Sequence, residues 1–343
     1  MVIRSGISTG VVSRSVTNKN SFERGIKLLS GNMLKSMYHR LETSALYGQS
    51  GIGEVEATGS LDADGNFVAG AGQVLKIKDA EWAAGIWVGT TRHKIDLFDS
   101  TLATLRGTVQ ITSYNLDSRT VTVDQDPAVL GVVADDNIFF QGSYDAIEGH
   151  KDMLGLHSIA EVRGTLFGIN NATEPLFQGN CVCVGADEAN PAPLSFAKIE
   201  EAVARSVEKG LQDEEMCVMV NVNSWNDLLT EQTAKRRYDS SYSSTEIQEG
   251  SKSIKFFGQA GDVKIVPSTY IKEGFAYAFC EKDLIRIGSS DVTFDPPGYE
   301  GEFFKLLENH NGYELRAYSD QALFTSRPSC VTILKFISNS KSC

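Results

Sequence analysis

The sequence predicts an α+β fold, in which helices and strands follow one another without a regular repeat. A helical pattern over Ser195–Leu211 is followed at once by the apolar strand pattern Cys217–Val222. Apolar and polar residues alternate on both sides of the turn Asn115–Arg119, which is typical of a hairpin. Short strand patterns then recur between Val263 and Ile337.

The N-terminal region predicts an arm followed by a helix. Residues 1–20 are rich in Ser, Thr, Gly and Asn and show no periodicity, so we expect an extended arm. Residues 21–47 predict a helix with Ser21 as its N-cap, because apolar residues recur every three or four positions. These residues are Phe22, Ile26, Leu29, Met33, Met37 and Leu41.

The next hundred residues predict a long loop and a small β subdomain. Residues 48–100 begin with a Gly-, Ala- and Asp-rich stretch around the turn Asp62–Gly65, which favours a long, flexible hairpin or extended loop over core structure. The chain returns to a packed surface at Trp82. Residues 105–144 carry the hairpin and a further short strand at Ile138–Phe140, which indicate a compact β subdomain.

The charge is unevenly distributed. The chain has 343 residues and a net charge of -12, which argues against a surface that binds nucleic acid nonspecifically. Residues 1–40 hold seven basic residues and one acidic residue, so the rest carries 25 basic and 43 acidic residues. A basic arm on an acidic body could bind a neighbouring copy of the chain; the alternative is a solvated tail.

Motif searches give no catalytic, cofactor-binding or metal-binding residue. The glycine-rich Gly48–Gly53 follows a helix instead of a strand, and no phosphate-binding loop or nucleophile-elbow motif occurs. Cys181 and Cys183 form C-x-C without a second pair, so buried thiols are expected. We therefore expect no enzyme and no cofactor.

Two further features bear on location. No apolar run approaches the ~20 residues needed to cross a bilayer, so no membrane association is expected. Residues 1–12 lack the apolar segment of a secretory signal, which favours synthesis in the cytoplasm.

The order of segments over most of the chain resembles the major capsid proteins of tailed bacteriophages, which have the HK97-like fold. The likeness lies in the order of the segments and in their general residue pattern, without an invariant motif. The stretches that carry it are Arg40–Gly51, Gly164–Phe177, Ser195–Leu211, Met216–Glu231, Phe256–Pro297 and Tyr313–Ile337.

The resemblance implies a division of the chain. Residues 1–20 look like the N-terminal arm, and residues 48–100 contain the extended E-loop and its return. Residues 145–224 and 289–343 look like the peripheral domain with its spine helix at 195–211, and 225–288 like the axial domain. Residues 105–144 look like an inserted small β domain.

The resemblance also implies a non-enzymatic function. Copies of the chain would form hexamers and pentamers of an icosahedral shell that encloses double-stranded DNA without sequence-specific binding. Scaffolding, portal and decoration proteins are the implied partners, and the location is the virion after assembly in the host cytoplasm. Residues of the arm and loop expected to contact neighbouring subunits are Arg4, Arg14, Lys19, Arg24, Asp62, Asp64 and Phe67.

Three alternatives remain open at this point. The first is an encapsulin-like compartment shell, and the second is a phage tail or baseplate component. The third is a hydrolase or other enzyme that uses His150 and His157, which are seven residues apart and near acidic residues.

Overall fold

The computed structural model describes residues 1–8, 19–161, 164–211, 214–236, 254–259, 261–295, 304–306 and 312–339. The chain divides into two compact units. Unit 1 comprises residues 1–45 and 286–324, and unit 2 comprises residues 46–285 and 325–343. The predicted mixed α+β architecture is confirmed.

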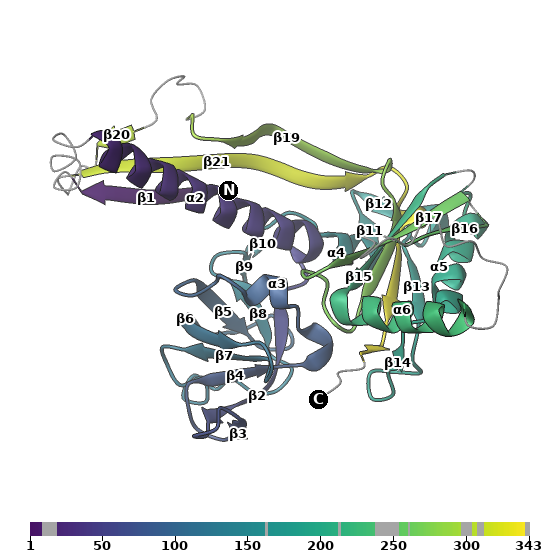
Figure 1. The fold of residues 1–343 in the computed structure, drawn as a ribbon, viewed down its shortest axis with the longest axis horizontal. Coiled ribbons are helices and arrows are strands. Elements are labelled where there is room, and N and C mark those ends of the chain that lie inside the picture. Colours follow the sequence, from purple (N-terminus) through teal and green to yellow (C-terminus); the bar gives the residue numbers. More distant parts are fainter. Residues whose placement is uncertain are drawn as a thin grey trace. The chain divides into compact units, whose positions relative to one another are not determined.

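In its described residues, unit 1 has one long helix and one sheet. The helix is α2 (Lys19–Tyr47), whose last two residues belong to unit 2. The strands are β1 (Val2–Ser8), β19 (Leu284–Thr293), β20 (Phe304–Leu306) and β21 (Gly312–Thr325). The central strand is β21, which pairs with β1, β19 and β20 (Figure 1).

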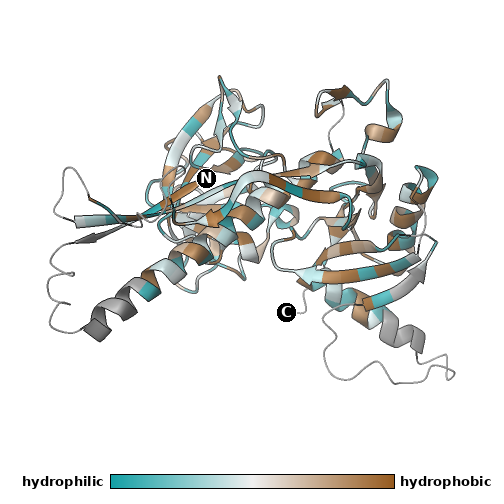
Figure 2. Ribbon diagram, turned by 90° about the horizontal axis from the view of Figure 1, so that it is seen from above, coloured by the Kyte–Doolittle hydropathy of each residue, from teal (hydrophilic) through white to brown (hydrophobic). Residues whose placement is uncertain are grey.

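One face of α2 packs on this sheet. Met33 and Met37 are buried against Leu315 and Ala317 of β21. The predicted apolar positions Leu29 and Leu41 pack beside them, together with Ile3, Val292 and Phe294. Figure 2 shows that hydrophilic and pale residues interrupt the hydrophobic ones along α2. The core of unit 1 is therefore a single narrow seam between helix and sheet.

Unit 2 begins with a β-barrel. Its strands are β2 (Gly53–Leu61), β3 (Phe67–Ala69), β4 (Val74–Ile77), β5 (Lys94–Phe98), β6 (Leu105–Asn115), β7 (Thr120–Val123) and β8 (Asn137–Phe140). The order is β3-β2-β4-β7-β6-β5-β8, and pairing of β2 with β8 closes the sheet. Fully buried residues such as Leu75, Ile95, Ile111 and Val121 fill the interior.

The rest of unit 2 is built on a six-stranded mixed sheet with the order β13-β22-β18-β15-β17-β16 (Figure 1). These strands are β13 (Asn180–Cys183), β15 (Met216–Asn221), β16 (Ile254–Gly258), β17 (Gly261–Ser268), β18 (Ala276–Cys280) and β22 (Thr332–Lys335). Helices α5 (Phe196–Glu208) and α6 (Val222–Arg236) share one hydrophobic cluster with the sheet, because Ile199, Val203, Trp225 and Leu228 pack with Val218 and Val220.

Short elements connect these layers. They are η1 (Asp79–Glu81), α3 (Ala84–Trp87), β9 (Tyr144–Asp145), β10 (Gly149–His150), α4 (Leu156–Glu161), β11 (Thr165–Leu166), β12 (Ile169–Asn170), η2 (Pro175–Phe177), β14 (Ala192–Pro193), η3 (Pro328–Cys330) and β23 (Ile337–Ser338). Of these, η1 and α4 carry side chains of the candidate site.

Two expectations about the N-terminal third are wrong. Residues 2–8 are not an arm without partners, because β1 pairs with β21 of the same chain along its whole length. In residues 53–98 the expected hairpin is present, since β2 pairs with β3 across the turn Asp62–Gly65. The expectation that this segment lies outside the core is wrong, because β2, β4 and β5 are barrel strands. Closure of the barrel gives the backbone groups of these strands partners within the chain. Residues 9–18 of the predicted arm lie outside the described residues.

The expected domain limits also need correction. Strands β6, β7 and β8 do form within 105–144, but they complete the same barrel as β2, β4 and β5 and are not a separate insert. The expected boundary between residues 224 and 225 crosses one sheet, since β13 and β15 share it with β17 and β18. The predicted helix at 195–211 is α5, and its role as a spine helix stays a proposal.

Candidate functional site

The richest polar site of unit 2 lies where the barrel meets the six-stranded sheet. The connection from β17 to β18 runs alongside η1: Glu273 donates its backbone N–H to Trp82 O at 2.9 Å, and Gly274 donates to Ala80 O at 2.8 Å. A Cβ on Gly274 would lie 2.6 Å from the Ala80 Cβ, so the two segments approach as closely as glycine allows. This contact brings Lys272 and Glu81 together.

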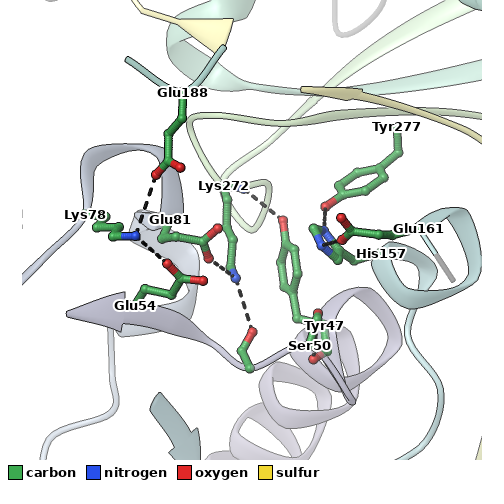
Figure 3. Close-up of polar contacts among 11 residues, drawn as sticks. Tyr47, Ser50, Glu54, Lys78, Glu81, His157, Glu161, Glu188, Lys272 and Tyr277 are labelled. Carbon is green, nitrogen blue, oxygen red and sulfur yellow. Dashed lines mark hydrogen bonds and ion pairs between the residues drawn. The ribbon is translucent and has the colours of Figure 1, made fainter. Parts of the chain in front are cut away.

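Lys272 is a buried cation with a complete set of partners (Figure 3). Its Nζ donates to Glu81 Oε2 at 2.5 Å and to Gly51 O at 3.2 Å, and lies 4.5 Å from the centre of the Tyr47 ring. Its backbone N–H donates to the Tyr47 hydroxyl at 2.9 Å. Burial by itself raises the pKa of Glu81, but the Lys272 ammonium outweighs it and the pKa is lowered. The ion pair is therefore charged.

His157 of α4 forms the second part of the network. Its Nδ1 lies 2.7 Å from the Tyr277 hydroxyl, and its Nε2 lies 2.7 Å from Glu161 Oε2 (Figure 3). Lys335 also pairs with Glu161. The hydrogen bond from His157, with that from Lys335, lowers the pKa of Glu161 to about 2. Burial raises the pKa of Tyr277, so its hydroxyl keeps its proton.

Basic residues of the barrel form a third part at the rim. Lys78 Nζ lies 2.7 Å from Glu54 Oε2, 2.7 Å from Asp135 Oδ1 and 3.6 Å from Glu188 Oε1. Burial by itself lowers the pKa of Lys78, but these carboxylates reverse the effect and raise it.

Arg119 makes a similar bridge. Its guanidinium binds Asp79 at 2.8 Å and Glu273 at 2.6 Å. Arg119 lies in the turn between β6 and β7 and Glu273 in the β17–β18 connection, so the Arg119–Glu273 ion pair crosses the junction between barrel and sheet.

The network borders a cavity of about 830 Å³. Its lining includes Lys78, Glu81, Arg119, His157, Lys272 and Lys335. Each of these side chains already has a hydrogen-bonding or ion-pair partner, and Lys272 is almost completely covered. The pairs Lys272–Glu81 and Arg119–Glu273 link the β17–β18 connection to the barrel side of the junction. Within the described residues of this cavity, we find no nucleophile activated by a base.

The histidines of the hydrolase alternative contact different residues. His150 packs on Tyr144, with ring centroids 4.8 Å apart, whereas His157 packs between Tyr47 and Phe275 at 5.9 and 5.1 Å. Burial lowers the pKa of His150. The two side chains therefore do not form one catalytic pair among the described contacts.

A second cluster comprises Glu214, Cys280 and Asp283, whose ligand atoms lie within 4.8 Å of one another. Arg327 Nη2 lies 2.5 Å from Glu214 Oε2 and 2.8 Å from Asp283 Oδ2. The Arg327 guanidinium therefore occupies the position that a metal ion would take between these carboxylates. Burial raises the pKa of the Cys280 thiol to about 11, which keeps it protonated. This geometry is that of an ion-paired cluster.

The residues predicted to contact neighbouring subunits are scattered. Arg4 lies on β1 with its side chain 72% exposed, 3.9 Å from Glu314. Asp62 accepts hydrogen bonds from the backbone of Asp64 and Asn66 and thus shapes the exposed turn before β3, where Phe67 lies. Arg14 and the side chains of Lys19 and Arg24 lie outside the described part. Their contacts with neighbours stay a prediction.

Sequence reasoning did not find the junction. Glu81 and Lys272 are 191 residues apart, and neither belongs to a motif. The one local signal was the turn Lys272-Glu273-Gly274 between two strand patterns, which does not indicate its partner.

Comparisons with known proteins give structural likeness alone. No protein-family model and no curated protein matches the chain. The chain is similar to the structure described as the cyanophage A-1(L) capsid asymmetric unit, with a TM-score of 0.39 and 14% identity over 56% of this chain and 62% of that one. It is similar to the capsid of cyanophage P-SCSP1u, with a TM-score of 0.31 and 12% identity over 47% and 54%.

A third similar structure is the SrpI encapsulin complex from Synechococcus elongatus PCC 7942, with a TM-score of 0.30 and 9% identity over 48% of this chain and 56% of that one. Each match spans less than two thirds of the other chain. In addition, no helix among the described residues is long and apolar enough to cross a membrane. Function has to be inferred from the geometry of the chain itself.

Proposed function

We propose that this chain is a structural subunit of a capsid-type shell, with the HK97-like fold that its sequence resembles, and that many copies of it assemble with one another. The observation that carries the proposal is the small core of unit 1. Four hydrophobic residues are buried there among the described residues: Met33, Met37, Leu315 and Ala317.

Long elements surround this small core. The 29 residues of α2 extend about 43 Å at 1.5 Å per residue, and β21 contributes 14 residues. Helices in proteins gain most of their stability from packing of an apolar face, and a sheet has to bury its hydrophobic face against another layer. Large hydrophobic side chains of unit 1 are instead exposed; they are Val2, Leu28, Tyr38, Ile287 and Leu306. Contacts with further copies would cover them.

Repeated contacts between identical copies suit this arrangement. Closed assemblies use the same surface many times, and many small contacts together give a stable shell. The two units then have different tasks: unit 2 supplies a large core and a charge-linked junction, and unit 1 supplies surface for neighbours. The predicted contact residues are part of this proposal: Arg4 lies in unit 1, and Asp62, Asp64 and Phe67 add a second contact surface at the exposed turn before β3 in unit 2.

In its specific form, the proposal is a major capsid protein of a tailed phage. Copies would form hexamers and pentamers of an icosahedral shell around double-stranded DNA, assembled in the host cytoplasm with scaffolding, portal and decoration proteins. The net charge of -12 supports a container that does not hold DNA tightly. An encapsulin-like shell or a tail component would share the same assembly physics; the particle's contents and shape distinguish them.

The test compares two double variants on one helix. Leu28→Ser with Tyr38→Ser removes two exposed hydrophobic side chains from α2, and Lys27→Ser with Lys35→Ser changes two exposed polar positions of the same helix. We expect sedimentation velocity to show loss of large assemblies for the first variant and their retention for the second. Equal assembly of both, with unchanged circular dichroism, would contradict the role given to unit 1.

A further inference from the structure

Strand β1 lies at one edge of the sheet of unit 1. Among the described residues it pairs on one side alone, with β21, in a register that runs without a shift from Val2 to Ser8. Proteins usually protect such an edge with a proline, a β-bulge or several charges. Strand β1 has no proline and no bulge, and Arg4 is its one charged residue. The outer side of β1 is therefore suited to pairing with a further strand.

The backbone groups that face the open edge follow from the pairing with β21. Met1 and Ser319 exchange both backbone hydrogen bonds, at 2.6 and 3.0 Å. Hydrogen-bonded and non-hydrogen-bonded pairs alternate along an antiparallel ladder, so the odd-numbered residues of β1 bond to β21. The N–H and C=O groups that point to the open edge are those of Val2, Arg4, Gly6 and Ser8.

One register pairs this edge with the same edge of a second copy over its whole length. When two copies run antiparallel with Ser5 opposite Ser5, all seven residues of β1 have a partner. Val2 then lies opposite Ser8 and Arg4 opposite Gly6, so each outward N–H meets an outward C=O. A register centred on Arg4 would place like charges opposite each other, which is destabilising. A register centred on Gly6 would pair a shorter stretch.

The charges of the sheet agree with the register centred on Ser5. In each copy Gly6 lies opposite Glu314 of β21, whose side chain is 8% exposed. Arg4 of one copy would therefore point across Gly6 of the partner subunit toward Glu314 of the partner subunit, and glycine leaves room for the guanidinium. Within its own chain Arg4 lies 3.9 Å from Glu314, which is a long ion pair. A second copy thus offers Arg4 an additional counter-charge.

We propose that two copies of this chain pair through β1, antiparallel and centred on Ser5, so that their sheets join in the order β19-β21-β1-β1-β21-β19. The contact is isologous, with a two-fold axis between the two Ser5 residues. Since this axis is perpendicular to the joined sheet, both copies of α2 lie on the same face of it. The inference rests on the proposed function: rings of subunits in a closed shell meet at two-fold axes, and this pairing would link one ring to the next.

A cysteine at position 5 tests the pairing. In the proposed register the two Ser5 residues form a non-hydrogen-bonded pair with Cα atoms about 4.5 Å apart, within the disulfide range of about 4.4–6.8 Å. Cys181 and Cys183 are exposed, in contrast to the buried thiols expected from the sequence. The test therefore uses the full chain with Cys181, Cys183 and Cys343 replaced by serine.

Ser5→Cys in this background is assembled in reducing buffer and then treated with glutathione disulfide. A non-reducing gel should show a covalent dimer that a reductant dissolves, and mass spectrometry should locate the link at position 5 of both copies. A chain that stays monomeric on the gel would overturn the pairing.

Two substitutions of Arg4 distinguish strand pairing from random collision of thiols. The N–H of Arg4 points to the open edge and is not used by β21. Arg4→Pro therefore removes a hydrogen bond of the proposed contact alone, and an edge strand tolerates proline at such a position. Arg4→Val is the matched control, because it removes the same charge and keeps the N–H. With Ser5→Cys, Arg4→Val should retain the dimer and Arg4→Pro should lose it; equal yields would refute the pairing.

A second pair of variants avoids the half-buried position of Ser5. Arg4 and Gly6 are exposed. In the proposed register Arg4→Cys of one copy faces Gly6→Cys of the other, with Cα atoms about 5.5 Å apart. Each variant alone places its two cysteines about 8.7 Å apart, too far for a disulfide. A mixture of the two should give dimers and each alone should not; dimers of a single variant at the same yield would contradict the register.

Negative-stain electron microscopy of the same samples before oxidation reports shell formation separately. Particles without cross-linked dimers would overturn the pairing and leave the proposed function standing. Cross-linked dimers without particles would support the pairing and contradict the shell.

Discussion

The ammonium of Lys272 lies 2.5 Å from Oε2 of Glu81, and this ion pair joins the β17–β18 connection to the barrel. The Lys272 side chain is 1% exposed and that of Glu81 is 14% exposed. A buried charge is tolerated when it is paired and hydrogen-bonded, and here Gly51 O supplies the additional acceptor. Removal of either Lys272 or Glu81 should therefore lower the stability of the protein strongly.

Replacement of Lys272 by Met should destabilise the protein by about 3–5 kcal/mol, because Glu81 stays buried without its counter-ion. Denaturant unfolding followed by tryptophan fluorescence measures the change. Lys76→Met is the matched control: its pair with Glu56 is exposed, at 28% and 41%, and should contribute less than about 1 kcal/mol. Equal losses for both variants would refute the importance of the buried pair, whereas recovery in Lys272→Met with Glu81→Leu would support it.

The stability of unit 2 should fall on acidification below the ordinary pKa of glutamate. The pKa of Glu161 is lowered from 4.5 to about 2 by hydrogen bonds from His157 and Lys335. A lowered pKa in the folded state gives a contribution that is complete above pH 4.5 and lost as the pH falls through about 2. Since the side chain is 46% exposed, solvent screening reduces the contribution to roughly 1 kcal/mol.

Glu161→Gln tests this pH dependence. The difference in unfolding free energy between the parent chain and the variant should be largest near pH 6 and should vanish near pH 2. A difference that is constant across this range would show that Glu161 contributes through packing instead of charge.

Gly274→Ala should weaken the contact between the β17–β18 connection and η1. The added Cβ would lie 2.6 Å from the Ala80 Cβ and 3.0 Å from the Ala80 O, so the backbone has to shift, at a cost of about 1–3 kcal/mol for overpacking. Limited proteolysis should cut the barrel away from the sheet sooner than in the parent chain. Gly31→Ala is the control, since no heavy atom lies within 4 Å of its added Cβ, and it should resist proteolysis like the parent.

The sequence could predict those elements whose signal is local. The apolar stripe of α2 and of α5 repeats with the helical period, and Leu29 to Leu41 do pack on the sheet of unit 1. The hairpin of β6 and β7 has a short turn between alternating residues, so its strands were found from pattern alone.

Long-range pairings could not be predicted in this way. Val2 lies opposite Tyr318 in the sheet of unit 1, and β2 closes the barrel by pairing with β8. The sequences of these short polar strands do not indicate which strand each of them pairs with. Deletion of residues 1–20 would remove β1 from the edge of β21 and would therefore disturb the fold of unit 1. The junction of Glu81 with Lys272 depends on both barrel closure and the β17–β18 turn.

Negative-stain electron microscopy of the purified chain, expressed alone and examined over a range of protein concentrations, tests the central claim most directly. The account predicts closed particles of uniform diameter, or rings of five or six copies that grow into them as the concentration rises. A folded protein that remains monomeric at every concentration, with no particles or rings, would contradict it.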